Sequence, residues 1–420
     1  MKKELNAQIH FYLTCLLAFL IPIWPPVISP LIILLFINWL IGGNFVHIFR
    51  KDNYLFYFII FISLYLVYLI GLSYSDHFDL GLNNLETKLS LLVLPVIFFA
   101  TQKFDKEKLN AVLRAFLNGC IIASLICFVY ASYCFITVKY AIAQGSGRWD
   151  YGINYFLKDR FSIWIHPSYR AMYFVLALVI LFFRFRKEHN ISSLKKYFYV
   201  TLLSIPVFLF SSKAGIISLF VLGIFVSCQL IFKQRRIKPV LIGGTVAVTI
   251  FCCLYFFAPE FTVKVKGAIN TLTEQTEGKN SSETTASRIV IWNAATQVAS
   301  QNWLTGSGTG DANEMLFKEY EKQQMTYALF ENLNAHNQFL QTFIETGIAG
   351  ILLLVSALIF TAVHSIRKRK YIYFSFLLLI AFNFTAESML EAQAGVVFYA
   401  FFNSLFMFSE EEKDHSRNEN

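Results

Sequence analysis

Residues 54–75 read YLFYFIIFISLYLVYLIGLSYS, a run of 22 residues that contains no charged side chain. A helix needs about 20 mainly apolar residues to cross the roughly 30 Å hydrocarbon layer of a bilayer. The stretches 214–232, 239–258 and 346–363 are equally free of charge. Since only a helix or a closed barrel satisfies its own backbone in lipid, these stretches predict membrane-spanning helices.

The composition of the whole chain agrees with a membrane environment. Of its 420 residues, 56% are hydrophobic and 15% are charged, against roughly 25% charged in an average soluble domain. The net charge of +9 comes from short basic clusters between apolar segments and not from one basic arm, which argues against nucleic acid as a partner. The seven cysteines lack CxxC or Cys/His spacing, so no metal centre and no cofactor is expected.

The apolar segments predict an all-α integral membrane protein with about 12 transmembrane helices. The N-terminal segment follows Lys2 and Lys3 and lacks a small-residue cleavage site, so we interpret it as a span and not as a signal peptide. The twelve predicted spans are 9–24, 27–46, 54–75, 85–101, 110–138, 168–185, 197–211, 214–232, 239–258, 346–363, 371–387 and 393–408.

Basic residues occupy every second connection, which predicts that both termini are cytoplasmic. Two connections on the opposite side, 139–167 and 259–345, are long, and loops longer than about 15 residues are usually functional or disordered. The sequence thus predicts four parts: an N-terminal bundle of spans 1 to 9 (1–258), a large helical periplasmic loop between spans 9 and 10 (259–345), a C-terminal bundle (346–409) and a cytoplasmic tail (410–420).

Polar residues line one face of a predicted helix where the long loop returns to the membrane. Gln338, Thr342 and Glu345 follow the i, i+4, i+7 spacing of a helix, and Asn337 lies on the adjoining column. A polar stripe that enters a membrane must face protein or a water-filled cavity. This segment is therefore our candidate for the functional part of the loop.

His336 stands at the predicted first turn of this helix, where the helix dipole disfavours protonation of the imidazole. A neutral imidazole can take a proton from an attacking hydroxyl, so His336 is a candidate general base. The alternative is a histidine that only caps the helix at the membrane interface. His166, which precedes Pro167 at the start of the sixth span, is a second candidate base or an interface residue.

Several cations on the same side could bind an anion. Arg288 and Trp292 share a helical face at i, i+4, and the planar fork of arginine suits diphosphate oxygens. Charged groups at membrane depth are costly and by default mark a function or a buried partner. Ion pairs with Glu86, Glu345, Glu387 or Glu391 are the alternative for the other four cations, which are Lys88, Arg160, Arg170 and Lys213.

Residues 336–350, HNQFLQTFIETGIAG, resemble the His-Asn-x-x-Leu…Glu-x-Gly-x-x-Gly signature of the O-antigen ligase and polymerase superfamily. The segments 287–292 and 306–310 and the basic turn at 211–215 also fit this family, and with the predicted spans the similarity covers essentially the whole chain. Members often carry Arg where this chain has Lys213, which binds phosphate as a point charge.

The resemblance implies a glycosyltransferase of the bacterial inner membrane, with its active site on the periplasmic face. The implied donor is a glycan on a polyprenyl diphosphate such as undecaprenyl diphosphate, and the implied acceptor is a sugar of the lipid A core. His336 would activate the acceptor hydroxyl, and Arg288, with the other cations, would meet the charge of the leaving diphosphate, in an inverting displacement without a metal. A glycan polymerase using the same donor is the alternative, and a transporter or flippase of lipid-linked sugars is a second one.

Overall fold

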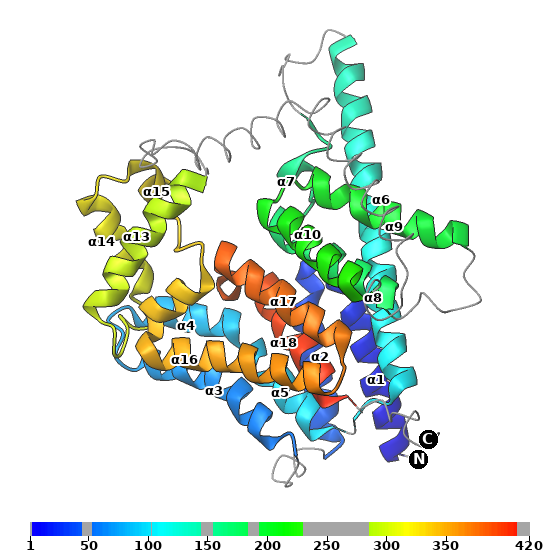
Figure 1. Ribbon diagram of the computed structural model, residues 1–420, viewed down its shortest axis with the longest axis horizontal. Coiled ribbons are helices and arrows are strands. Elements are labelled where there is room, and N and C mark those ends of the chain that lie inside the picture. Colours follow the sequence, from blue (N-terminus) through cyan, green and yellow to red (C-terminus); the bar gives the residue numbers. More distant parts are fainter. Residues whose placement is uncertain are drawn as a thin grey trace.

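The computed structural model describes residues 2–43, 53–101, 103–143, 154–183, 193–229 and 285–409 (Figure 1). Every regular element within these ranges is a helix, which confirms the all-α prediction. Predicted span nine (239–258), residues 259–284 of the long loop and the tail 410–420 lie outside the described residues. The helices are α1 (Lys2–Leu20), η1 (Pro25–Val27), α2 (Ile28–Ile41), α3 (Leu55–Leu72), α4 (Phe78–Lys88), α5 (Ser90–Ala100), α6 (Lys106–Ala143), α7 (Lys158–Phe161), α8 (Pro167–Phe183), α9 (Ser193–Leu209), α10 (Lys213–Cys228), α13 (Thr285–Gln301), α14 (Ala312–Lys322), α15 (Thr326–Phe330), α16 (Gln338–Arg367), α17 (Tyr371–Ala386), η5 (Met389–Glu391) and α18 (Gln393–Phe408).

Four helical stretches in the described residues are long and apolar enough to cross a membrane. They are Leu55–Leu72, Phe78–Ala100, Lys106–Val138 and Gln338–Arg367, and five further apolar helices are shorter. Large apolar side chains such as Val129 and Ile136 of α6 are 69% and 64% exposed, as expected where lipid surrounds the protein. The count of about twelve spans stays a prediction.

Several predicted boundaries differ from the structure, and three of the differences are large. The expected span 85–101 is two helices, α4 and α5, which meet at Leu89. The expected span 9–24 is α1, which begins at Lys2 and ends at Leu20, before Pro22. Helix α16 begins at Gln338 and not at 346, because the side chain of Asn337 caps it and extends the helix into the predicted loop.

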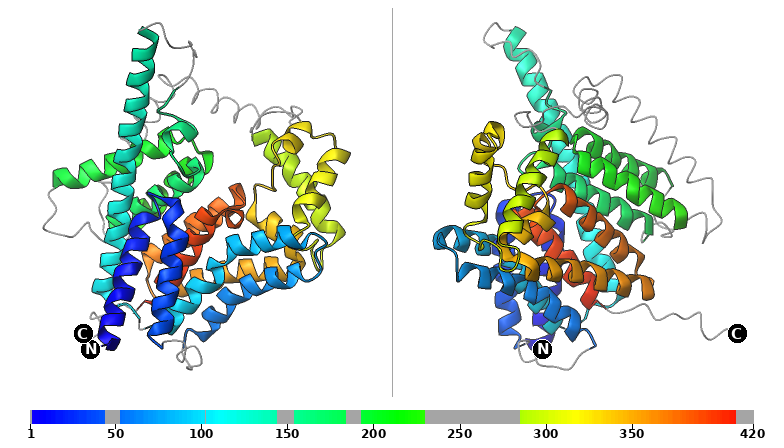
Figure 2. Two further views of the ribbon diagram at one scale, coloured as in Figure 1. Left: turned by 180° about the vertical axis from the view of Figure 1, so that it is seen from behind. Right: turned by 60° about the vertical axis from the view of Figure 1, so that its left-hand side comes forward.

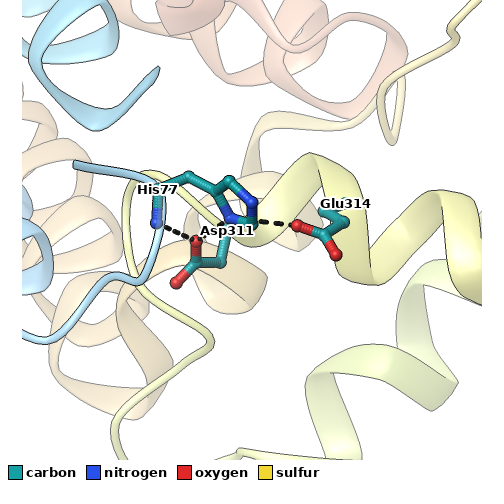
Figure 3. Close-up of side chains that lie close together, drawn as sticks. All are labelled: His77, Asp311 and Glu314. Carbon is teal, nitrogen blue, oxygen red and sulfur yellow. Dashed lines mark hydrogen bonds and ion pairs between the residues drawn. The ribbon is translucent and has the colours of Figure 1, made fainter. Parts of the chain in front are cut away.

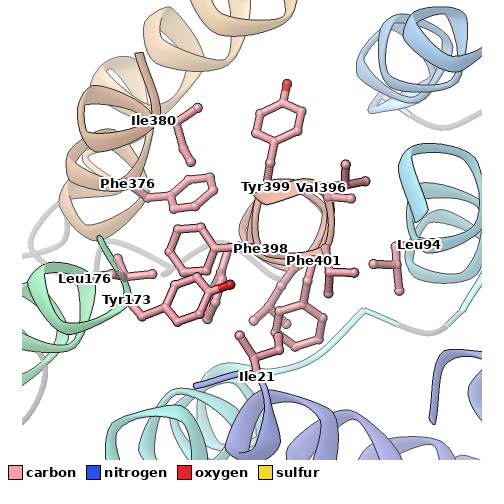
Figure 4. Packing of buried hydrophobic residues seen from close by; sticks show 14 of the residues in the cluster. Ile21, Leu94, Tyr173, Leu176, Phe376, Ile380, Val396, Phe398, Tyr399 and Phe401 are labelled. Carbon is pink, nitrogen blue, oxygen red and sulfur yellow. The ribbon is translucent and has the colours of Figure 1, made fainter. Parts of the chain in front are cut away.

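Helix α18 lies at the centre of the bundle. All its residues from Gly395 to Phe408 are buried, and a helix that is apolar all round must be surrounded by other protein elements. Figure 4 shows its side chains meeting Leu94 of α5, Tyr173 of α8 and Phe376 of α17. The same core fixes the short segment Met389–Glu391 that leads into α18 and, as shown below, borders the candidate site.

Helices α13, α14 and α15 form a cap with its own apolar core at one end of α16 (Figures 1 and 2). This confirms helical structure in the described part of the long loop. Ile344 of α16 belongs to the cap core, together with Ile291, Leu316 and Tyr320. The cap is therefore packed directly against the polar start of α16.

The glycine-rich loop 306–310 lies between α13 and α14 and forms hydrogen bonds to α16 at a kink in that helix. Gly347 has φ +62, outside the helical region, and the freed carbonyls of Ile344 and Glu345 accept hydrogen bonds from Ser307 N (2.7 Å) and Gly308 N (3.1 Å). A Cβ on Gly306, which has φ +75, would meet Thr346 N at 2.5 Å, so this contact requires glycine. The loop amides thus bind protein carbonyls and hold the cap in place.

Candidate functional site

The backbone of His336 is held in an uncommon conformation just before α16. His336 has φ +45, the left-handed region that non-glycine residues rarely adopt, at a cost on the order of 1 kcal/mol. Its amide donates to Asn334 Oδ1 (3.0 Å), and its carbonyl accepts from Trp292 Nε1 (3.4 Å). The next residue, Asn337, caps α16, so His336 precedes the helix. The sequence had suggested instead that His336 lies in the first turn.

Glu387 connects the histidine to the predicted arginine. Its Oε2 lies 3.2 Å from His336 Nδ1, and its Oε1 accepts from Arg288 Nη2 at 2.9 Å. Arg288 Nη1 also donates to the carbonyl of Ala386 at 2.5 Å. Because Glu387 is the first residue after α17, these contacts join the cap helix α13, the start of α16 and the end of α17 in one cluster.

The charges around Glu387 determine which nitrogen of His336 is basic. The guanidinium of Arg288, 2.9 Å from Glu387 Oε1, favours the ionised form of this carboxylate. An ionised carboxylate only accepts hydrogen bonds, so the Nδ1 of a neutral His336 must carry the hydrogen. Nε2 then keeps its lone pair, and it is the nitrogen that can take a proton.

His336 Nε2 is buried and has no hydrogen-bond partner among the described residues. An unsatisfied buried polar atom costs about 1–3 kcal/mol, so such atoms in proteins call for an explanation such as a ligand. The side chain of His336 is 16% exposed. The ring is thus held at Nδ1, while Nε2 has no partner among the described residues.

Two serines extend the cluster toward the predicted basic turn. Ser168 of α8 donates to Glu387 Oε1 at 3.1 Å, and the hydroxyls of Ser168 and Ser212 lie 3.2 Å apart. Ser212 caps α10, and Lys213 is the first residue of that helix and half-buried. The turn containing Lys213 is therefore linked to Glu387 through two hydroxyl groups.

The other predicted cations on this side have different surroundings. Arg170 is 1% exposed and donates to Cys127 Sγ (2.8 Å) and to the carbonyl of Ile163 (2.5 Å). Arg160 is exposed, and its guanidinium lies 5.9 Å from the ring centre of Tyr155. These contacts tie α8 and the segment before it to α6, and they do not include the His336 cluster.

His166 lies beside the cluster, next to Ser168. It is exposed, and its Nδ1 accepts from the amide of Ser168 at 3.4 Å. Asn337, which also belongs to the predicted functional segment, donates its backbone amide to Ser388 Oγ at 3.2 Å. Both residues are neighbours of the pair formed by His336 and Glu387.

Lys88 and Glu345 form a second buried group beside the first. Lys88 Nζ lies 2.6 Å from Glu391 Oε1 and 3.4 Å from Glu345 Oε2, and it also contacts Asn84 Oδ1. Lys88 and Glu345 are fully buried. These contacts favour the ion-pair alternative for Lys88. We therefore assign to Lys88 the role of holding α4 against α16 and η5.

Sequence reasoning named Glu387 and Glu391 only as possible ion-pair partners of the cations. In the structure α17 ends at Ala386, and the following residues are extended or 3₁₀. The two carboxylates therefore reach different partners, Arg288 and Lys88. Ser168 and Ser388 carried no signal in the sequence, whereas Ser212 lies in the predicted basic turn 211–215.

A cluster away from this site joins His77, Asp311 and Glu314 (Figure 3). His77 Nδ1 lies 2.7 Å from Asp311 Oδ1 and 3.0 Å from Glu314 Oε2. Their ligand atoms lie within 4.8 Å of one another, so these three residues are the group in the described chain that could hold a metal. The carboxylates already bind protein groups, since Asp311 accepts two backbone amides and Glu314 pairs with Lys318. We interpret the cluster as an anchor between the α3–α4 turn and the cap.

The strength of this anchor is expected to depend on pH. The hydrogen bond with Asp311 and the charge of Glu314 raise the pKa of His77. The stabilisation of the anchor by His77 is therefore complete below about pH 6.5, the pKa of a free histidine, and is lost as the pH rises through the raised pKa. Partial burial raises the pKa of Asp311, but hydrogen bonds from the amides of His77 and Asp76 lower it further, so that the pKa is below its usual value. The stabilisation of the anchor by Asp311 is therefore lost only as the pH falls below about 4.

We therefore predict stronger amide protection in α14 at about pH 6 than at about pH 9, after correction for intrinsic exchange rates. Hydrogen–deuterium exchange with mass spectrometry measures this difference. His77→Gln should remove the pH dependence while leaving the protection of α18 unchanged. An equal difference in the variant would show that another group causes it.

Comparison with protein families finds a match to the segment that contains most of the site. Residues 198–355 match the family model described as O-Antigen ligase. This segment of the chain is therefore similar to the O-antigen ligase family. A search of the curated proteins found no match. Together with the helices of membrane-spanning length, the similarity supports a membrane protein of the glycosyltransferase type found in the O-antigen ligase and polymerase family.

The O-antigen ligase match covers less than half of the chain but most of the cluster. It contains Lys213, Arg288, Trp292, His336 and Glu345. Glu387 lies outside the matched segment, and only the folded structure brings it to His336 and Arg288. The matched segment thus supplies the histidine and the arginine, and the segment after α17 supplies the carboxylate that contacts both.

Proposed function

We propose that this chain transfers an O-antigen-like glycan from a polyprenyl diphosphate to an acceptor sugar, with the lipid A core as the acceptor, at the periplasmic face of the bacterial inner membrane. The observation that carries the proposal is the pairing of His336 Nδ1 with Glu387, which leaves a buried Nε2 without a partner among the described residues. A fixed imidazole with one free nitrogen suits a general base.

The reaction that we propose is a direct displacement at the anomeric carbon. The acceptor oxygen forms a bond to this carbon while the bond from the carbon to the diphosphate oxygen breaks, and the configuration inverts. His336 Nε2 takes the proton of the acceptor hydroxyl, and the electron pair of the broken bond leaves with the polyprenyl diphosphate. No external acid is needed, because the diphosphate is a stable anion once its charge is compensated.

Arg288 is the group that we assign to this compensation. Its guanidinium has five N–H donors and spends two of them in the contacts with Glu387 and Ala386. Its side chain is 24% exposed, so the remaining donors can reach a ligand. Lys213 is the second candidate, since its turn connects to Glu387 through Ser212 and Ser168. Arg160 and Arg170 are weaker candidates because of their separate contacts.

The experiment that tests this function uses the purified chain in proteoliposomes with a labelled polyprenyl-diphosphate glycan and lipid A core. Label on the lipid A core, unaffected by a metal chelator, is the result that we expect. Label in longer chains that stay on the carrier would assign the protein as a polymerase. Movement of intact carrier lipid across the bilayer without a transfer product would contradict the proposal in favour of a flippase.

A further inference from the structure

The turn that carries His336 is held through its backbone amides. The amide of His336 donates to Asn334 Oδ1 at 3.0 Å. The amide of Ala335, the residue before the histidine, donates to the side-chain oxygen Oε1 of Gln341 at 3.2 Å. A sparsely populated backbone conformation, such as the φ of +45 at His336, persists only where the surrounding structure over-determines it. Gln341 is therefore one of the side chains that keep the histidine in this conformation.

The side-chain amide of Gln341 has a defined orientation. Gln341 is 1% exposed, and Ala335 is fully buried. A backbone N–H can only donate, so the Gln341 atom that faces it must be the oxygen. The NH₂ group then donates to Glu345 Oε1 (2.8 Å) and to Asn313 Oδ1 (3.3 Å), so each of its two hydrogens has an acceptor. The amide cannot turn over without losing the bonds to Ala335 and Glu345.

These hydrogen bonds connect the turn to the buried ion-pair group and to the cap. Glu345 lies 3.4 Å from Lys88 of α4, and Asn313 belongs to the cap helix α14. Helix α4 and the cap both contact the start of α16 (Figure 1). Gln341 thus joins the backbone before His336 to two parts of the protein that packing holds in place.

We propose that Gln341 is a positioning residue for His336 in the transfer reaction. By holding the amide of Ala335, it keeps the His336 ring where Nδ1 meets Glu387 and Nε2 can reach the acceptor hydroxyl. Gln341 acts through the histidine and takes no proton itself. This inference rests on the function proposed above, because it assigns a role within the same site.

The test variant is Gln341→Met, which keeps the length of the side chain and removes its three hydrogen bonds. The matched control is Asn403→Leu on α18. Asn403 is also a buried amide, 2% exposed, and it accepts a hydrogen bond from Tyr373. Each replacement leaves a buried hydrogen-bonding group without its partner, so both variants lose stability.

Two measurements separate positioning from stability. Steady-state transfer in proteoliposomes gives kcat and the donor KM separately. Nitrogen NMR of isotope-labelled histidine, recorded in micelles without substrate, shows which ring nitrogen of His336 carries the hydrogen. The signals that disappear in His336→Ala identify this residue.

We expect Gln341→Met to lower kcat about 10²-fold, as a displacement of about 1 Å at a reacting group can do. The donor KM should stay within about twofold of wild type, and the hydrogen of the His336 ring should no longer be confined to Nδ1. The control should keep the wild-type kcat and the wild-type NMR signals. An equal fall of kcat in both variants, or wild-type His336 signals in folded Gln341→Met, would overturn the proposal.

An exchange variant keeps the proposal testable if Gln341→Met does not fold. In Q341E/E345Q the donor and the acceptor of the Gln341–Glu345 bond change places, and the new carboxylate can still accept from Ala335 N. We expect this variant to keep the hydrogen on Nδ1 of His336 and to transfer within about tenfold of wild type. A folded exchange variant without that hydrogen position would overturn the bond to Ala335 as the cause.

The NMR measurement needs no substrate, so it separates this inference from the proposed function. If wild type transfers no glycan while Gln341→Met changes the His336 signals, the proposed function is contradicted and Gln341 still orients the histidine. If wild type transfers glycan and Gln341→Met matches it in kcat and in NMR signals, the positioning role alone is contradicted.

Discussion

Replacing His336 with alanine is expected to lower the rate of glycan transfer by about 10²–10⁴-fold, the usual contribution of a general base. The variant removes Nε2, the nitrogen that we propose as proton acceptor, and leaves Arg288 and Glu387 paired with each other. Donor binding should therefore be retained while the chemical step slows. A single-turnover assay in proteoliposomes, with donor and acceptor both saturating, measures this step.

His364 supplies the control for that experiment, because it lies at the other end of α16. Its ring contacts Tyr54 and Tyr57, with ring centres 5.8 Å and 5.1 Å apart, so His364→Phe keeps an aromatic ring in place. This variant should transfer within about twofold of wild type. A His336→Ala protein that is folded and transfers at a near-normal rate would exclude His336 as the base.

Replacing Lys88 with methionine is expected to destabilise the folded chain by about 3–5 kcal/mol, the usual cost of removing one partner from a buried ion pair. Lys88 is fully buried between Glu345 and Glu391, and it is the cation that contacts both carboxylates. Without it, two buried carboxylates face each other and at least one must take up a proton. Unfolding in detergent micelles with increasing dodecyl sulfate measures the loss.

Two further variants show whether buried charge causes this loss. The triple variant K88M/E345Q/E391Q removes the charges together and should recover most of the stability. K318M removes a lysine that also pairs with a carboxylate, Glu314, but is 62% exposed, so it should leave the unfolding midpoint unchanged. A loss below about 1 kcal/mol in K88M would mean that the group is not an essential support of α4.

The local features of the site could be predicted from the sequence. Gln338, Thr342 and Glu345 share one face at helical spacing, and in the structure all three are fully buried. Helical periodicity relates residues a few positions apart, so it needs no knowledge of the rest of the fold. The same holds for the helix that carries Arg288 and for the turn that begins at Lys213.

The partners of these residues could not be predicted, because they come from distant parts of the chain. Glu387 is 51 residues from His336 and 99 residues from Arg288. It reaches both only because α17 ends at Ala386 and the chain continues in an extended conformation. Likewise, only the packing of α4 against α16 and η5 decides that Lys88 pairs with Glu345 and Glu391.

Glu387→Gln tests the orienting role of the carboxylate. Glutamine keeps the size of the side chain but removes the negative charge that fixes the hydrogen on His336 Nδ1 and would stabilise the imidazolium. We expect the transfer rate to fall by up to about 10⁴-fold, as when the carboxylate of a hydrogen-bonded catalytic histidine is neutralised. The amount of folded protein should not change, because the amide can still contact His336 and Arg288.

The measurement that tests the central claim most directly is a double-mutant cycle of His336→Ala and Glu387→Gln in the single-turnover transfer assay. Our account predicts that wild type transfers the labelled glycan, that each single variant is slow, and that the double variant is no slower than His336→Ala, because Glu387 acts through His336. Independent, multiplying effects would contradict the pairing as the source of catalysis, and no transfer by folded wild type with authentic donor and acceptor would contradict the proposed function itself.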